Sequence, residues 1–176
     1  MTVKDFIDNN KDYNPKKDTG YDALVILSKK FNIDYLKCNI EIINPNDIKY
    51  IFPYNFDKIN GGYNRLMGEN VDYINWDLNK GWKVNINNLM FCKGKVLDEK
   101  KFDFHDMYTK KNYKKLYLDI KKNGYVYNKS LPTIVCLDRD GNICFIDGQH
   151  RFIISKLLKI EKYPVIILFK HPYYEK

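Results

Sequence analysis

Residues 133–158 read TIVCLDRDGNICFIDGQHRFIISKLL, and this stretch decides the fold. Its first part has two apolar runs separated by DRDG at 138–141. That pattern predicts a β-hairpin, because Asp-Gly favours the tight turn between paired strands. Its last part is apolar at helical spacing and predicts a helix that extends to about Ile160. Residues 147–151, DGQHR, therefore lie where a strand ends and a helix begins, and we call them the box.

The position of the box predicts an anion-binding site. The first backbone N–H groups of a helix have no partner inside the helix, and with the helix dipole they attract phosphate. Gly148 lets a ligand approach the backbone closely. Arg151 can hold a phosphate through two parallel hydrogen bonds. We therefore expect phosphate or nucleotide contacts from Gly148, Gln149, His150 and Arg151.

The sequence on either side of the box predicts further helices and strands. A helix over 21–31 would be capped by Asp18 or Thr19, and an apolar stripe at 113–120 predicts a helix that stops at Gly124. Strands are predicted at 40–43 and 163–169, the second of them buried, and Asn46-Asp47 would cap a short turn into 48–52. In the C-terminal third, the order of predicted elements is helix, hairpin, helix and strand.

Two regions are less well defined. Residues 1–18 are polar, and we expect a loosely held lead-in there. Between 53 and 105, Gly61, Gly62 and Gly68 indicate loops, and 73–77 and 82–86 are expected to be strands or extended segments. We interpret Trp76 and Trp82 as aromatic core, with stacking on a base or sugar as the alternative.

The composition does not by itself identify a partner. The 176-residue chain has a formal net charge of +8, but only three of its 30 basic residues are arginines. The lysines are scattered in short runs, which favours a solvated surface over a polyanion-binding face. Both readings remain open at this stage, so nucleic acid is kept as an alternative partner.

The cysteines and the termini bear on location. None of the four cysteines lies in a CxxC pair, so we expect buried free thiols in a reducing compartment and no zinc site. Cys136 and Cys144 would lie near each other on the two arms of the hairpin. No signal peptide is recognisable, and the apolar run at 165–169 is too short to span a bilayer. The expected location is cytoplasmic, with no membrane partner.

The C-terminal part of the chain resembles the ParB/sulfiredoxin superfamily. The matching pieces are a helix ending in IKKNG, LPTIV at 131–135, the hairpin over Asp140-Gly141, the box, and YPVI at 163–166. The resemblance covers about a third of the chain. It implies the fold class α/β (α+β), a small mixed sheet with helices and an elaborated N-terminal half. In that fold the box binds nucleotide phosphates at a helix N-terminus. The length of the chain predicts one domain, in which we expect a ParB/sulfiredoxin-like core at 113–176, an N-terminal elaboration at 19–112 and the lead-in at 1–18.

Members of this superfamily differ at the box. Sulfiredoxins carry a reactive cysteine just before the His-Arg pair, where this chain has Gln149, so we do not expect sulfinic acid reduction. Chromosome-partitioning ParB proteins carry Gly-Glu-Arg-Arg, bind CTP and continue into a helix-turn-helix. Because this sequence ends at Lys176, we expect no such DNA reader here.

Free-serine kinases of this fold carry Asp-Gly-His-His-Arg, and Asp147, Gly148, His150 and Arg151 match four of these five positions. This likeness implies phosphoryl transfer to a small molecule from a nucleoside triphosphate or diphosphate with magnesium. Asp147 and His150 would then be catalytic, together with an upstream carboxylate that acts as the base. Asp47 is the first candidate for that carboxylate, and Asp106 is the second.

Several alternatives remain. The chain could be a ParB-like DNA-binding or nuclease accessory protein without its own helix-turn-helix, or a scaffold that has lost its ligand. Asp147 could be only the N-cap of the helix, and His150 could have no ligand. Asp138 and Asp140 are more typical of turns than of metal sites. An acid–base pair of His105 with Asp106 is disfavoured, because adjacent residues on a strand face opposite sides.

Overall fold

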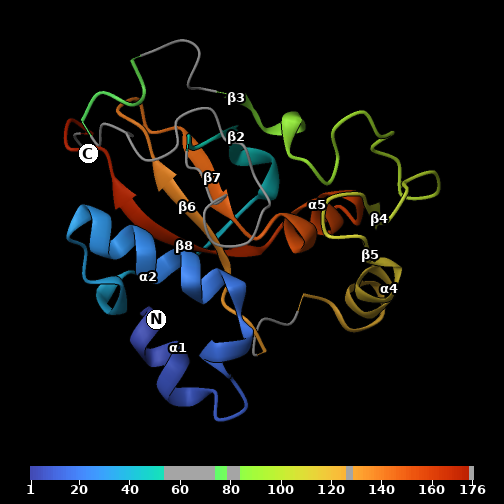
Figure 1. The fold of residues 1–176 in the computed structure, drawn as a ribbon, viewed down its shortest axis with the longest axis horizontal. Coiled ribbons are helices and arrows are strands. Elements are labelled where there is room, and N and C mark those ends of the chain that lie inside the picture. The colour runs from blue at the N-terminus through green and yellow to red at the C-terminus, as the bar shows by residue number, and fades with distance from the viewer. Residues whose placement is uncertain (54–73, 79–83, 126–128, 175–176) are drawn as a thin grey trace.

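A computed structural model describes residues 1–53, 74–78, 84–125 and 129–174 of the chain (Figure 1). Its centre is a six-stranded mixed sheet with strand order β1-β8-β6-β7-β2-β3. The strands are β1 (Ile40–Ile43), β2 (Ile48–Ile51), β3 (Val84–Asn85), β6 (Thr133–Leu137), β7 (Ile143–Asp147) and β8 (Tyr163–Lys170). The pairs β2–β7 and β6–β8 are parallel and the others are antiparallel, which confirms the expected mixed α/β class.

Helices cover both faces of this sheet. The α-helices are α1 (Val3–Asn9), α2 (Thr19–Phe31), α4 (Lys114–Asn123) and α5 (Gln149–Leu157). Successive residues of β6 point to opposite faces: Ile134 and Cys136 pack with the α1–α2 side, whereas Val135 packs with the α4–α5 side. The central strands are therefore buried on both faces, which explains their nearly continuous apolar sequence.

Most elements predicted from the sequence are present. The helix α2 has Asp18 as its N-cap, whose Oδ1 accepts from the Gly20 amide at 3.0 Å. Gly124 ends α4 with a positive φ of 74°. Cys136 and Cys144 are direct partners across the β6–β7 hairpin, as the hairpin required, and both are buried free thiols.

Three expectations were wrong. Residues 1–18 are not loosely held: α1 begins with a capping box of Thr2 and Asp5, and Val3 and Phe6 are fully buried. Two apolar residues three apart are enough to fix one short helical face on the core, and the polar composition conceals them. Residues 74–78 form turns rather than a strand, and α5 ends at Leu157, three residues before Ile160.

Part of the middle region cannot be compared with its prediction. Residues 84–85 form β3, and 86–88 form the short 3-10 helix η5 (Ile86–Asn88). Trp76 is fully buried against Phe52, so its interpretation as core is confirmed. Gly61, Gly62, Gly68, Tyr73 and Trp82 lie outside the described residues.

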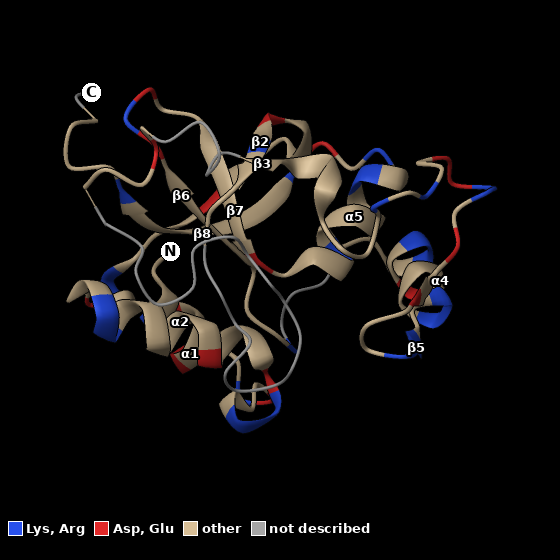
Figure 2. Cartoon of the chain, turned by 45° about the horizontal axis from the view of Figure 1, so that its top comes forward, with Lys and Arg blue, Asp and Glu red and all other residues tan. Residues whose placement is uncertain are grey.

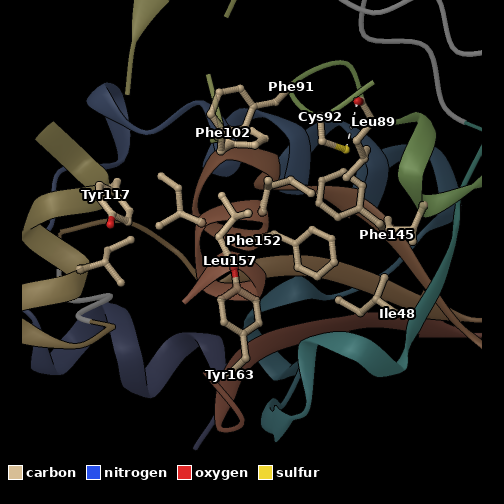
Figure 3. Packing of buried hydrophobic residues seen from close by; sticks show 14 of the residues in the cluster. Ile48, Leu89, Phe91, Cys92, Phe102, Tyr117, Phe145, Phe152, Leu157 and Tyr163 are labelled. Carbon is tan, nitrogen blue, oxygen red and sulfur yellow. Dashed lines mark hydrogen bonds between the residues drawn. The ribbon is translucent and has the colours of Figure 1, made fainter. Parts of the chain in front are cut away.

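The α4–α5 side of the sheet holds the box helix in place (Figure 3). Phe152 and Leu157 of α5 pack with Phe145 of β7, Tyr163 of β8 and Phe91 from the segment before β4. Each such aromatic or leucine side chain contributes about 2 kcal/mol when fully buried. The start of α5 is therefore fixed by its own apolar face and by three other parts of the chain.

No helix among the described residues is both long and apolar enough to cross a membrane.

Candidate functional site: the cavity at the box

The backbone of the box turns sharply between β7 and α5. Asp147 is the last residue of β7, and Gly148 is the N-cap of α5 with a φ of 102°. A Cβ at Gly148 would lie 2.8 Å from Oγ1 and 3.1 Å from Cα of Thr133, so a side chain has no room there. The N-cap position is thus occupied by Gly148 and not by Asp147.

The first turn of α5 presents unbonded amides. The first helical hydrogen bond runs from the Phe152 amide to the Gly148 carbonyl at 3.2 Å, and the N-cap supplies no side-chain acceptor. Within the described part of the chain, the amides of Gln149, His150 and Arg151 have no acceptor. Three convergent N–H groups at the positive end of a helix are a ready site for an anion.

This turn opens onto a cavity of about 280 Å³. The other walls come from the start of α2, the start of α4 and residues 129–132. Three basic side chains line it: Lys17, Lys129 and Arg151. Two carboxylates also line it, Asp18 and Asp147. The Asp18 carboxylate is already engaged by the Gly20 and Leu131 amides and the Tyr13 hydroxyl.

Arg151 is oriented by neutral groups. Its Nη2 donates to the Leu131 carbonyl at 2.7 Å, and its Nη1 donates to the Tyr125 hydroxyl at 3.2 Å. Among the described residues no carboxylate lies within 4.0 Å of the guanidinium. The side chain is therefore held at the cavity wall with its charge uncompensated, as a phosphate ligand requires.

His150 is held on three sides. Its Nε2 lies 2.6 Å from Oδ2 of Asp106, a residue of β4 (His105–Asp106). The Tyr113 ring stacks on the imidazole at 3.7 Å between ring centroids, and the Phe91 ring meets it edge-on at 4.7 Å. Asp106 is itself fixed by the amides of Tyr108 and Thr109. Its side chain is only 1% exposed, so the imidazole orientation is tightly defined.

The pKa values of Asp106 and His150 are both lowered, but for different reasons. Burial raises the pKa of Asp106, but the hydrogen bonds from His150, Tyr108 and Thr109 outweigh it and the net pKa is lowered. Burial lowers the pKa of His150 and outweighs the opposing effect of Asp106. At neutral pH the pair therefore consists of an ionised Asp106 and a neutral His150.

The structure gathers four of the residues expected at the site. Asp147, Gly148, His150 and Arg151 all line the cavity. Gln149 does not: its side chain is buried, and its Oε1 accepts from the Phe91 amide at 3.1 Å. Its role is to tie the segment containing Phe91 to the start of α5, and only its backbone amide is directed by the helix toward an anion.

The two candidate carboxylates are placed very differently. Asp47 ends the short 3-10 helix η3 (Pro45–Asp47), and the next residue, Ile48, pairs with Ile143 at the start of β7. Asp47 is thus at the opposite end of β7 from the box and does not join the site. Asp106 does join it, through His150. His105 is exposed while Asp106 is buried, so the two do face opposite sides of the strand.

Sequence reasoning missed part of the cavity wall. Lys17 belongs to the short 3-10 helix η1 (Pro15–Lys17), which precedes the Asp18 cap, and Lys129 precedes β6 by four residues. Both looked like ordinary surface lysines. Tyr113 was recognised only as part of an apolar stripe. Lys17, Lys129 and Tyr113 come together only because three distant segments of the chain meet at the cavity. No local sequence pattern predicts that meeting.

A second cluster of charges lies elsewhere in the fold. The Asp77 carboxylate accepts hydrogen bonds from Nε and Nη2 of Arg139, at 2.9 and 2.8 Å, and from the Arg139 amide at 3.0 Å. His171 lies 3.3 Å from the same carboxylate; its Nε2 meets the Ile74 carbonyl and its Nδ1 accepts the Tyr173 amide. These contacts tie residues 74–78 to the β6–β7 turn.

Asp138 is a turn former, as expected. Its Oδ1 accepts from the amides of Asp140 and Asn142, at 2.9 and 2.8 Å. Within the residues that the structure describes, no group of three or more His, Cys, Asp and Glu side chains is placed to hold a metal ion.

A larger cavity, of about 560 Å³, lies near the C-terminal end of α5 and is lined by Lys156, Lys159 and residues 97–100. The helix dipole is negative at that end and works against an anion there. For a phosphate, the smaller cavity at the box is the better site.

Comparison of the chain with protein-family models, with curated proteins and with solved structures gives no significant match.

Proposed function

We propose that this chain binds the phosphate groups of a nucleotide or a phosphorylated small molecule in the cavity at the box. One observation carries the proposal: the amides of His150 and Arg151, which have no acceptor among the described residues, lie at the same cavity as the Arg151 guanidinium, which has no carboxylate partner there. Amides at a helix start and a fixed arginine are complementary to phosphate in both charge and geometry.

The rest of the wall agrees with an anionic ligand. Lys17 and Lys129 add positive charge on the sides of the cavity away from α5. Ligand pockets usually exceed about 300 Å³. At about 280 Å³ the cavity suits a di- or triphosphate chain with part of a sugar, leaving a base outside. A magnesium ion would be held mainly by the phosphates themselves, as is usual for this ion.

Nucleic acid is less well supported as the partner. Figure 2 shows lysine and arginine residues on α2, α4, α5 and several loops rather than gathered on one face. DNA binding normally requires a continuous basic surface that follows the phosphate backbone. DNA therefore enters the experiment below as a competing outcome.

The test is calorimetric titration with ATP, ADP, CTP and GTP, each with magnesium, and with inorganic pyrophosphate. We expect at least one of these to bind, and Arg151→Ala to weaken that binding by at least about tenfold through loss of a charge-assisted bidentate contact. Lys16→Ala is the control, because Lys16 is exposed and does not line the cavity. If none of these ligands binds, or if duplex DNA binds and Arg151→Ala leaves it unchanged, the proposal is wrong.

A further inference from the structure

The His150 side chain, paired with Asp106, is fixed by more contacts than phosphate binding at the box requires. Phosphate binding at the box is served by the amides and by Arg151. The imidazole, in contrast, is fixed by a buried carboxylate, a stacked tyrosine and an edge-on phenylalanine. Holding a histidine this firmly beside a ligand cavity is typical of a group that moves a proton.

The contacts define which nitrogen is available. Asp106 is acceptor-only when ionised, so the neutral imidazole must carry its proton on Nε2 in order to donate to Oδ2. Nδ1 is then a bare lone pair, and it has no hydrogen-bond partner within the described part of the chain. His150 and Tyr113 both line the cavity, so the imidazole borders the bound ligand.

The charges around His150 favour a neutral base. Asp106 from β4 faces Nε2, while Lys95 and Lys111 act on the imidazole from the preceding segment and from β5 (Lys111–Asn112). The two lysines and burial disfavour the protonated form, and Asp106 partly opposes them. The group therefore starts unprotonated and can share the positive charge it gains with Asp106, as a general base must.

We infer that His150 is a general base for phosphoryl transfer to a hydroxyl group, and that Asp106 is its positioning residue. The inference rests on the proposed phosphate site. Nδ1 of His150 takes the proton of the acceptor hydroxyl, and the freed oxygen forms a bond to the terminal phosphorus of a nucleoside triphosphate. The bond from that phosphorus to its bridging oxygen breaks, and the electron pair stays on the released nucleoside diphosphate. The acceptor class is thus an alcohol, with water as the simplest member.

The first experiment reads the proton position by ¹⁵N NMR of the histidine side chains, without any ligand. In the native protein, neutral His150 should carry its proton on Nε2. Asp106→Asn should move it to Nδ1, because Oδ1 of the asparagine can keep the Tyr108 and Thr109 amides while its NH₂ group faces His150. Asp103→Asn, in the same segment, is the control. A native protein with the proton on Nδ1 would overturn the inference whether or not phosphate binds.

The second experiment follows turnover by ³¹P NMR with ATP, CTP or GTP, magnesium, and water or glycerol as acceptor. His150→Gln keeps a donor for Asp106 but removes the base. We expect this variant and Asp106→Asn to lose at least about 100-fold in rate. His105→Gln, at the exposed neighbour, should keep the native rate.

Calorimetry on the same samples separates the two proposals. Nucleotide affinity in His150→Gln and Asp106→Asn should stay within about threefold of native, because the phosphate contacts come from backbone amides, which both variants keep, and from Arg151. Nucleotide binding without turnover in the native protein, or turnover retained in His150→Gln, would overturn the base but leave the phosphate site intact. Loss of nucleotide binding in the native protein would instead overturn the proposed function itself.

Discussion

Two buried carboxylates, Asp77 and Asp106, each lie beside a histidine at different places in this fold, and the two clusters differ in how completely they are paired. In the first, Asp77 is matched by the guanidinium of Arg139, and both ring nitrogens of His171 are engaged. In the second, Asp106 has two backbone amides and a neutral His150 as partners, and His150 keeps one ring nitrogen without a hydrogen bond in the described part of the chain.

The difference lies in what each cluster leaves unsatisfied. The cluster at Asp77 closes on itself and joins residues 74–78 to the β6–β7 turn. The cluster at Asp106 borders a cavity where, within the described residues, amides at the start of α5 have no acceptor and the Arg151 guanidinium has no carboxylate partner. Helix-start amides, a guanidinium without a counter-charge and an imidazole nitrogen with a free lone pair around one cavity are the features expected of a site for an anionic ligand.

The largest expected effect comes from removing the charge of each carboxylate in turn. Asp77→Asn should lower the free energy of unfolding by about 2 kcal/mol, because Arg139 loses its counter-charge. Asp106→Asn should lower it by about 1 kcal/mol, because its partner is neutral and the amide contacts survive. Urea denaturation measures both. If Asp106→Asn proved the more destabilising change, Asp77 would not be the more strongly paired carboxylate.

An intermediate effect is expected from pH. The pKa of His150 is lowered in the folded protein mainly by burial, so the unfolded chain takes up its proton first as the pH falls through about 6.5. Stability should therefore decline from pH 7.5 to pH 5.5, while the lowered pKa values of Asp77 and Asp106 act only near pH 4 and below. Thermal midpoints should fall over this range in the native protein and less in His150→Gln. Equal slopes in the two proteins would contradict a buried neutral His150.

The smallest expected effect separates two adjacent lysines. Lys17 lines the cavity and Lys16 does not, although both are exposed residues of η1. Lys17→Ala should weaken binding of the nucleotide found by calorimetry about threefold, and more at low salt, because exposed charges are strongly screened. Lys16→Ala should change the affinity by less than that. Equal changes for the two variants would mean that the ligand senses only net charge.

Local patterns predicted much of the fold. The DRDG turn predicted the β6–β7 hairpin, Asp18 predicted the start of α2, and Gly124 predicted the end of α4. Each of these rests on residues that are neighbours in the chain. The lead-in at 1–18 was misjudged because its helix α1 depends on two apolar residues whose burial only the rest of the core makes favourable.

At the box, too, local sequence predicted some features, and tertiary contacts decided the others. A glycine between a strand and a helix, followed by histidine and arginine, was enough to predict an anion site at 147–151. The same pattern could not tell that Gln149 turns inward to the Phe91 amide. It also could not choose between Asp47 and Asp106, because that choice depends on which end of β7 each carboxylate reaches.

The sequence by itself determined the strand–glycine–helix junction, the helices and strands on either side of it and the residues that offer donors to an anion, because these follow from chain neighbours and periodicity. Only the tertiary structure decided that Asp106 holds His150, that Arg151 lacks a carboxylate within the described residues, and that Lys17 and Lys129 complete the cavity. Those contacts join segments distant in the chain, so their chemistry is set by the packing of α2, α4 and α5 around one end of the sheet.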